Sequence, residues 1–307
     1  MRTQDRKHYT TIQVDLDGLW AIEQLIGKDV PIDPDPVFIM GLERLLRLFE
    51  ENKIKATFFV VARDLGVGRK VELLKDLVAR GHEIASHGVG HRYLSRLGKD
   101  EIKEEIVESK IVLEKALGII VAGFKAPGFA ATKEMSVFLE EAGYIYDSSV
   151  FGTSCGFLME MVSGVPYMKT DMFFAPSVPY RPSRSNIFRA GDSDIMEIPV
   201  TPMPFFRTPA HFSYAVIGGS MYAGMVRASF RLASPEMINY LFHPLDLVDS
   251  SMVTMSGKVY GLDTKANRKI DMARKMLTFL CKGRTVVTTK ELCEVIKESD
   301  RGASEAS

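Results

Sequence analysis

The segment PDPVFIMGLERLLRLFEENKIKATFFVVA, residues 34–62, joins a helical pattern directly to a strand pattern. Asp35 and Pro36 stand where a helix N-cap and a first helical residue are expected. Apolar side chains then recur on one helical face, at Phe38, Leu42, Leu45, Leu46 and Phe49. The continuous apolar run at 55–62 is typical of a parallel strand buried on both faces. The segment therefore predicts an amphipathic helix followed at once by a buried strand.

The same alternation extends over the first 150 residues. Upstream, an apolar and β-branched run ends in VDLDG, residues 14–18. Downstream, helical and strand patterns alternate in RKVELLKDLVARG, HEIASH, EIKEEIVESKIVLEKALG, VAGFKAP, TKEMSVFLEEAG and YIYDSS. Regular patterns return with MEIPV, MINYLFHP, KANRKIDMARKMLTFL and TVVTTKEL. This order predicts an α/β fold with a parallel sheet or barrel.

One domain over residues 1–300 is the expectation for a chain of 307 residues, because β/α barrels of this size are common. Between about 152 and 233 the alternation breaks, and the chain is rich in Pro and Met. We expect irregular loops over a barrel mouth there; the alternative is a surface for a lipid-linked substrate or a membrane face. Residues 301–307 are expected to be a disordered tail.

Composition narrows the classes of function. Lys and Arg total 39, as do Asp and Glu, so no basic excess points to nucleic acid. Neither an apolar leader nor a membrane-spanning run occurs, which predicts a cytoplasmic protein. Cys155, Cys281 and Cys293 form no CxxC pair, and free thiols fit a reducing compartment.

Histidines and aspartates at two strand ends suggest a metal site. His87 and His91 are four residues apart in SHGVGH, so both imidazoles can reach one metal ion. Asp15 and Asp17 end another strand on the same face, and two histidines with one carboxylate make a site with open positions. One Asp then binds metal while the other accepts a proton from the attacking water. Solvated surface histidines and loop-capping aspartates are the alternative.

Three more strand ends carry polar groups. GFKAPGF offers Lys125 and a Pro-Gly turn whose backbone N–H can face an oxyanion, YDSS offers Asp147, and YLFHPLDL offers His243. Each also has a plain explanation, as a surface lysine, a helix-capping Asp or a core histidine. In β/α barrels, however, the active-site residues lie at the carboxyl ends of the strands, and all these motifs are expected at such ends.

In order and content, these motifs resemble those of the polysaccharide deacetylases of the NodB-homology type, carbohydrate esterase family 4. That family carries an Asp-containing first motif, then H-S/T-x-x-H, R-x-P-x-G, D-S-S and L-x-H, and the resemblance spans roughly residues 9–295. It implies a distorted seven- or eight-stranded (β/α) barrel and a divalent metal, usually zinc, that hydrolyses N-acyl groups on sugars.

The resemblance also implies a role for each matching residue. Asp17, His87 and His91 would bind the metal, and Asp15 would be the general base. The remaining four matches are Lys125 orienting the base, the Gly128 N–H in the oxyanion hole, His243 as general acid, and Asp147 as a partner that tunes the pKa of His243.

Three departures from the family pattern bear on the substrate. Leu16 separates the two aspartates, in a D-x-D form that resembles a subgroup with intracellular members. Lys125 replaces an arginine, and so lacks its bidentate fork. Finally, APGF replaces the usual aromatic-glycine pair and changes what lines the acyl pocket.

The expected reaction is removal of an N-acetyl or N-formyl group from a cytoplasmic or lipid-linked amino sugar. Peripheral contact with the inner face of the membrane is a further expectation, and the oligomeric state is left open. The alternatives are an allantoinase-like hydrolase of a small cyclic amide and an inactive sugar-binding barrel. Metal content separates the binding module from the enzymes, and the acid released separates the two enzymes.

Overall fold

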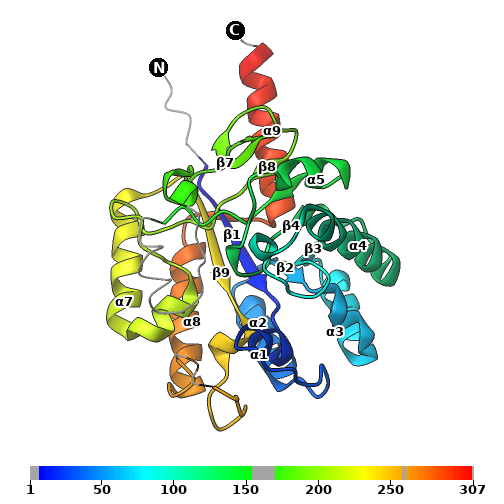
Figure 1. Cartoon of the computed structure of the whole chain (residues 1–307). Helices are drawn as coiled ribbons and strands as arrows, with labels where there is room; N and C mark the ends of the chain where they lie inside the picture. The colour runs from blue at the N-terminus through cyan, green and yellow to red at the C-terminus, as the bar shows by residue number, and fades with distance from the viewer. Residues whose placement is uncertain (1–6, 154–169, 258, 260, 306–307) are drawn as a thin grey trace.

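Figure 1 shows the computed structural model, which describes residues 7–153, 170–257, 259 and 261–305. Strands and helices alternate through most of the chain, as the sequence predicts. The elements are β1 (Tyr9–Asp15), α1 (Leu19–Leu25), α2 (Pro36–Glu51), β2 (Thr57–Val60), α3 (Gly68–Ala79), β3 (Glu83–Ser86), α4 (Lys99–Leu117), β4 (Gly123–Phe124), α5 (Met135–Glu141), β5 (Tyr146–Asp147), β6 (Pro182–Ser183), β7 (Asn186–Ala190), β8 (Met196–Glu197), α7 (Phe212–Ala233), β9 (Met237–Phe242), α8 (Ala266–Cys281), β10 (Thr285–Val286) and α9 (Thr289–Glu305).

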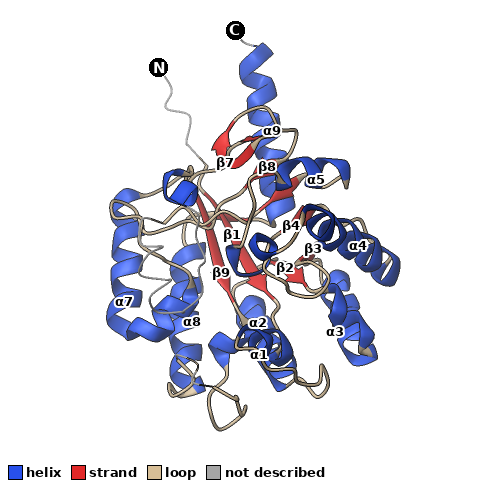
Figure 2. Cartoon of the chain, viewed as in Figure 1, coloured by secondary structure: helices blue, strands red, loops and turns tan. Residues whose placement is uncertain are grey.

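The main sheet is parallel and holds eight strands. β1 lies beside β9 on one side and beside β2 on the other, and the order continues through β3, β4, β5 and β8. β10 pairs only with the first two residues of β1. Figure 2 shows these strands gathered at the centre, with helices around them. The sheet curls into a half-barrel, which confirms the predicted distorted (β/α) barrel.

Helix α2 begins as its sequence predicts. Asp35 is the N-cap, and its carboxylate accepts a hydrogen bond from the backbone N–H of Phe38. The helix packs so closely on the turn after β9 that a Cβ at Gly41 would lie 2.4 Å from the carbonyl oxygen of Pro244. Glycine is therefore required at this approach, which also fixes the turn that follows His243.

The strand register brings the predicted motifs to one level. Asp15 pairs with Phe59, Val60 with Ser86, and Ser86 with Phe124. On the other side of β1, Val14 pairs with Phe242. Just after these paired positions come four of the predicted site residues, namely Asp17, His87, Lys125 and His243.

Asn239 closes the gap between β8 and β9, the two ends of the curled sheet. The backbone N–H of Thr201 donates to the Asn239 carbonyl at 2.9 Å. The buried side-chain amide of Asn239 donates to the carbonyls of Ile198 and Pro199, and its oxygen accepts from Thr11 Oγ1. One side chain thus joins three parts of the barrel wall.

The structure differs from the prediction in three segments. Irregular structure is wrong for residues 212–233, which form the 22-residue helix α7, and for the β6–β7 hairpin. Two adjacent glycines, Gly218 and Gly219, hide the helical pattern, and the helix is kinked at Gly219. The disordered tail from residue 301 is also wrong as far as Glu305, because α9 continues to that residue.

The structure tests only part of the predictions about the cysteines and about membrane-spanning segments. Cys281 and Cys293 are free thiols, whereas Cys155 lies outside the described residues. Within the part of the chain that the structure describes, no helix is both long enough and apolar enough to cross a membrane.

Replacing the closing residue tests this view of the barrel. Asn239→Ala should lower the free energy of unfolding by about 1–3 kcal/mol, because it leaves buried carbonyl groups without donors. Chemical denaturation monitored by circular dichroism measures the change. Asn267→Ala, at an exposed position on α8, is the control and should stay near the wild-type value. Equal stability of the two variants would contradict a closing role for Asn239.

Candidate metal centre and active site

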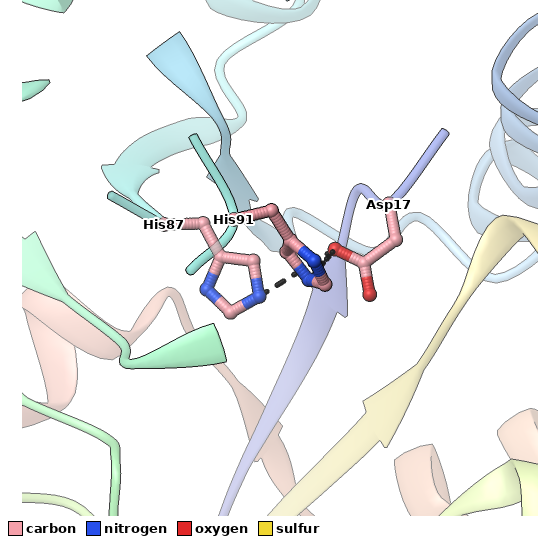
Figure 3. A group of neighbouring side chains, drawn as sticks. All are labelled: Asp17, His87 and His91. Carbon is pink, nitrogen blue, oxygen red and sulfur yellow. Dashed lines mark ion pairs between the residues drawn. The ribbon is translucent and has the colours of Figure 1, made fainter. Parts of the chain in front are cut away.

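Three ligand atoms converge beyond the ends of β1 and β3 (Figure 3). Asp17 Oδ1 lies 3.5 Å from His87 Nε2 and 3.2 Å from His91 Nε2. The two imidazoles are buried, and the carboxylate is largely buried. Among the described residues, this is the only group of three or more His, Cys, Asp and Glu side chains that lie close enough to share one metal ion.

The hydrogen bonding of these atoms fits a cation. Asp17 Oδ1, His87 Nε2 and His91 Nε2 are buried and lack a hydrogen-bond partner in the structure. Because the backbone carbonyl of Lys125 can only accept, the hydrogen on His87 lies on Nδ1, which is 2.8 Å from that oxygen. His87 Nε2 therefore directs a lone pair at the same point as Asp17. Three buried acceptors without a donor are a suitable set of ligands for a divalent metal ion.

The loop between the two histidines is held from two sides. Glu105 on α4 accepts hydrogen bonds from the backbone N–H groups of Val89 and Gly90. Gln24 on α1 donates to the carbonyls of Gly90 and His91. Gly88 has a φ of 78°, and a Cβ there would lie 2.8 Å from the Glu105 carboxylate. These contacts keep both imidazoles in place before any metal binds.

A buried ion-pair cluster supports the turn after Asp17. Lys70 lies between Asp35 and Asp64, at 2.7 and 2.6 Å, and all three side chains are buried. Asp35 also accepts from the backbone N–H of Leu19, and Asp64 accepts from Trp20 Nε1 at 2.7 Å. The lysine of GVGRK, residues 66–70, is thus committed to two carboxylates.

Trp20 links this cluster to the metal ligands. Its ring meets that of His91 edge to face, with 6.5 Å between the centroids. The indole is fixed at its nitrogen by Asp64 and covered by the guanidinium of Arg63. The position of His91 thus depends on residues far from the HxxxH segment.

Asp15, the last residue of β1, is paired with Lys125. The ammonium group is 2.8 Å from Asp15 Oδ1 and 2.8 Å from Gln13 Oε1. Burial lowers the pKa of Lys125, and the negative charge of Asp15 opposes that shift. The sequence predicts a looser hold by lysine than by arginine. In the structure Gln13, which sequence reasoning missed, supplies a second acceptor.

His243 approaches Asp15 from the end of β9. Its Nε2 lies 3.8 Å from Asp15 Oδ2, and its Nδ1 lies 3.0 Å from Ser213 Oγ and 3.6 Å from Asp246 Oδ2. Burial by itself lowers the pKa of His243. The hydrogen bond and negative charge of Asp246, with the charges of Asp15 and Asp17, outweigh burial and raise the pKa to about 9. His243 is therefore protonated at neutral pH.

The predicted tuning partner of His243 lies elsewhere. Asp147 hydrogen-bonds Ser149 and lies beside the buried Glu197. Burial raises the pKa of Asp147 to about 6, and burial together with the charge of Asp147 raises the pKa of Glu197. These two acids are thus a separate pair. The carboxylate next to His243 is Asp246, and its position three residues after the histidine was the available sequence signal.

Gly128 and two aromatic rings form another wall near the site. Gly128 adopts a φ of 58° in the short turn Pro127–Phe129, a conformation that suits glycine. The rings of Phe129 and Phe151 stack with centroids 5.1 Å apart, and His211 packs on both. The role of the Gly128 N–H in an oxyanion hole stays a prediction.

The single tryptophan of the chain offers a test of the metal site. Because Trp20 packs against His91, binding of Zn²⁺ to the metal-free protein should change the tryptophan emission, and a chelator should reverse the change. His91→Ala should abolish this response, as measured by fluorescence titration. The control is His8→Ala, since His8 lies beside Pro235 at the other end of β1. A full response in His91→Ala would contradict the assigned metal site.

Comparison with known proteins finds similarity over part of the chain. Residues 40–146 match the family model for polysaccharide deacetylases. The match includes His87, His91, Lys125 and Gly128, whereas both aspartates of VDLDG and His243 lie outside it. A peptidoglycan-N-acetylglucosamine deacetylase of Bacillus cereus is 29% identical over 122 residues, which cover 40% of this chain and 54% of that protein. The alignment thus spans about half the length of this relative.

Solved structures show the same fold over nearly the whole chain. A Mycobacterium smegmatis protein assigned to the polysaccharide deacetylases aligns with a TM-score of 0.64 and 18% identity, covering 98% of this chain and 94% of its own. A Puue allantoinase aligns with a TM-score of 0.63 and 14% identity, covering 96% of this chain and 91% of its own. The family match thus covers residues 40–146, and the solved structures show that the fold of the polysaccharide deacetylases extends over nearly the whole chain.

Proposed function

We propose that this protein is a metal-dependent amide hydrolase that removes an N-acetyl or N-formyl group from an amino sugar. One observation carries the proposal. The partnerless ligand atoms of Asp17, His87 and His91 lie beside a carboxylate, Asp15, and a protonated imidazole, His243. Amide hydrolysis needs a base for water and an acid for the departing nitrogen, and both groups are present.

Asp17, His87 and His91 would hold the cation, and their nitrogen and oxygen donors suit Zn²⁺. When bound, the cation supplies Lewis-acid polarisation of the amide carbonyl. The hydrogen bond from His87 Nδ1 to the Lys125 carbonyl keeps Nε2 free for this purpose.

The chain's own residues provide the proton transfers. Asp15 accepts the proton of the attacking water, and Lys125 holds the carboxylate in position. His243 then donates a proton to the leaving nitrogen, because an amine does not leave as an anion. We assign the Gly128 N–H to the oxyanion that develops on the acyl carbon.

A cytoplasmic or lipid-linked amino sugar is the proposed substrate. The relative from Bacillus cereus is named for a deacetylase of N-acetylglucosamine in peptidoglycan, which supports an N-acylated amino sugar. The D-x-D spacing of Asp15 and Asp17 and the free thiols Cys281 and Cys293 support the intracellular subgroup. We further propose that the enzyme acts at the inner face of the membrane.

A screen for released acid tests the activity and separates the alternatives. The zinc-loaded protein is incubated with N-acetyl and N-formyl amino sugars, free and lipid-linked, and with allantoin as a cyclic amide. Release of acetate or formate supports the proposal, whereas turnover of allantoin alone favours the cyclic-amide hydrolase. Metal binding without any turnover favours an inactive sugar-binding barrel.

The role of Asp15 predicts a selective loss of activity. Asp15→Asn should lower kcat about 100-fold or more, because the amide cannot accept the proton from water. Zinc content should stay close to that of the wild type, since Asp15 is no proposed ligand. Asp263→Asn, at an exposed position, is the control. An Asp15→Asn enzyme with near-normal kcat would refute the assignment.

The environment of His243 predicts the alkaline limb of the pH profile. A general acid works only while protonated, so activity should fall as pH rises through the pKa of His243, about 9 in the metal-free structure. Asp246→Asn removes the main group that raises this pKa, and the alkaline limb should move to lower pH. The pH dependence of kcat/KM measures the shift. Asp147→Asn should leave the limb in place, and a shift in that variant instead would favour Asp147 as the partner.

A further inference from the structure

Large apolar side chains are unusually exposed on one part of the molecule. Met221 and Leu232 on α7 are each 79% exposed, and Met225 is also exposed. Phe205 and Phe206, in the turn before α7, are exposed as well. We call these five residues the α7 surface. They are separate from every residue assigned to the candidate active site.

The helical residues of this surface form one stripe. After the kink at Gly219, the exposed positions Met221, Met225 and Leu232 recur at intervals of four and seven residues, and the exposed Ala228 lies between the last two. Such spacing places all of them on one helical face. The opposite face, with Ala223, Val226 and Phe230, is buried in the core. The helix is therefore apolar on both its inner and its outer side.

The aromatic turn is tied to the same helix. Tyr222 OH donates to the carbonyl of Pro209 at 2.5 Å, which joins the turn to α7 next to Met221. Figure 1 shows α7 at the edge of the molecule, with α8 on its inner side.

The segment that carries the α7 surface has charges of one sign. Residues 198–235 contain no Asp or Glu, although the whole chain has as many acidic as basic residues. The stretch has three arginines, Arg207, Arg227 and Arg231. Arg231 is exposed on α7 and Arg227 is half-buried, both on the same flank of the helix between the stripe and the buried face, and neither forms an ion pair with a carboxylate of the described residues. An apolar stripe bordered by unpaired cations is typical of a helix that lies on an anionic membrane.

We infer that the α7 surface docks on an anionic lipid bilayer. Its apolar side chains would enter the acyl boundary, and Arg227 and Arg231 would contact lipid phosphates. A second copy of the chain fits less well, because two such surfaces would bring arginines together without carboxylates to pair with them. Docking would also bring lipid close to the candidate site, since Ser213, at the start of α7, contacts His243.

Vesicle binding tests the inference without using activity. The full-length protein is centrifuged with vesicles of phosphatidylcholine alone or with added phosphatidylglycerol. Binding should be stronger to the anionic vesicles and should weaken as salt rises. Met221→Gln with Met225→Gln should weaken this binding about tenfold or more. Ile120→Gln is the control, because Ile120 is 80% exposed but lies in the connection between α4 and β4.

A second pair of variants tests the charge. Arg227→Gln with Arg231→Gln should lower binding to anionic vesicles about tenfold and leave the weak binding to phosphatidylcholine unchanged. Lys99→Gln with Lys115→Gln on α4, away from α7, should have little effect. Failure of the wild type to bind anionic vesicles at low salt would overturn the inference. The inference would also be overturned if vesicle binding is absent and light scattering shows a dimer that the substitutions at Met221 and Met225 disrupt.

Discussion

The parallel register of β1 with its neighbours is the constraint on which the site depends. β1 pairs with β9 over Tyr9–Val14 and with β2 over Gln13–Asp15, and the parallel pairing continues from β2 through β3 to β4. Because parallel strands end on the same side, Asp15, His87, Lys125 and His243 meet there although they are far apart in sequence. A slip of one residue in any strand would turn its polar side chain toward the other face.

Buried charge is the second constraint, and two buried lysines show how it is compensated. Lys125 lies between Asp15 and Gln13, and Lys70 lies between Asp35 and Asp64. Removing such ions from water costs several kcal/mol each, so they persist only with close partners. At the metal centre, by contrast, three ligand atoms from three neighbouring side chains lack donors and lie together. A bound cation would supply the missing compensation.

The local patterns anticipated the elements where spacing and composition agree. Helix α2 begins at Pro36 after the Asp35 cap, and α3 is followed by Gly81, which has a φ of 82°. Prediction failed at α7, where paired glycines and apolar side chains on two faces hide the helical period. A helix that is apolar on its outer side gives no contrast between core and solvent, so the pattern did not reveal it.

The sequence by itself determined the β/α alternation, the residue types at the strand ends and the HxxxH spacing, because these depend on neighbours along the chain. Only the tertiary structure decided which groups act together. It placed Asp246 beside His243, paired Asp147 with Glu197, and gave Lys125 a second acceptor in Gln13. Lys125 and Gln13, like Asp147 and Glu197, lie in or just after different strands, and the register that joins them is a property of the folded sheet.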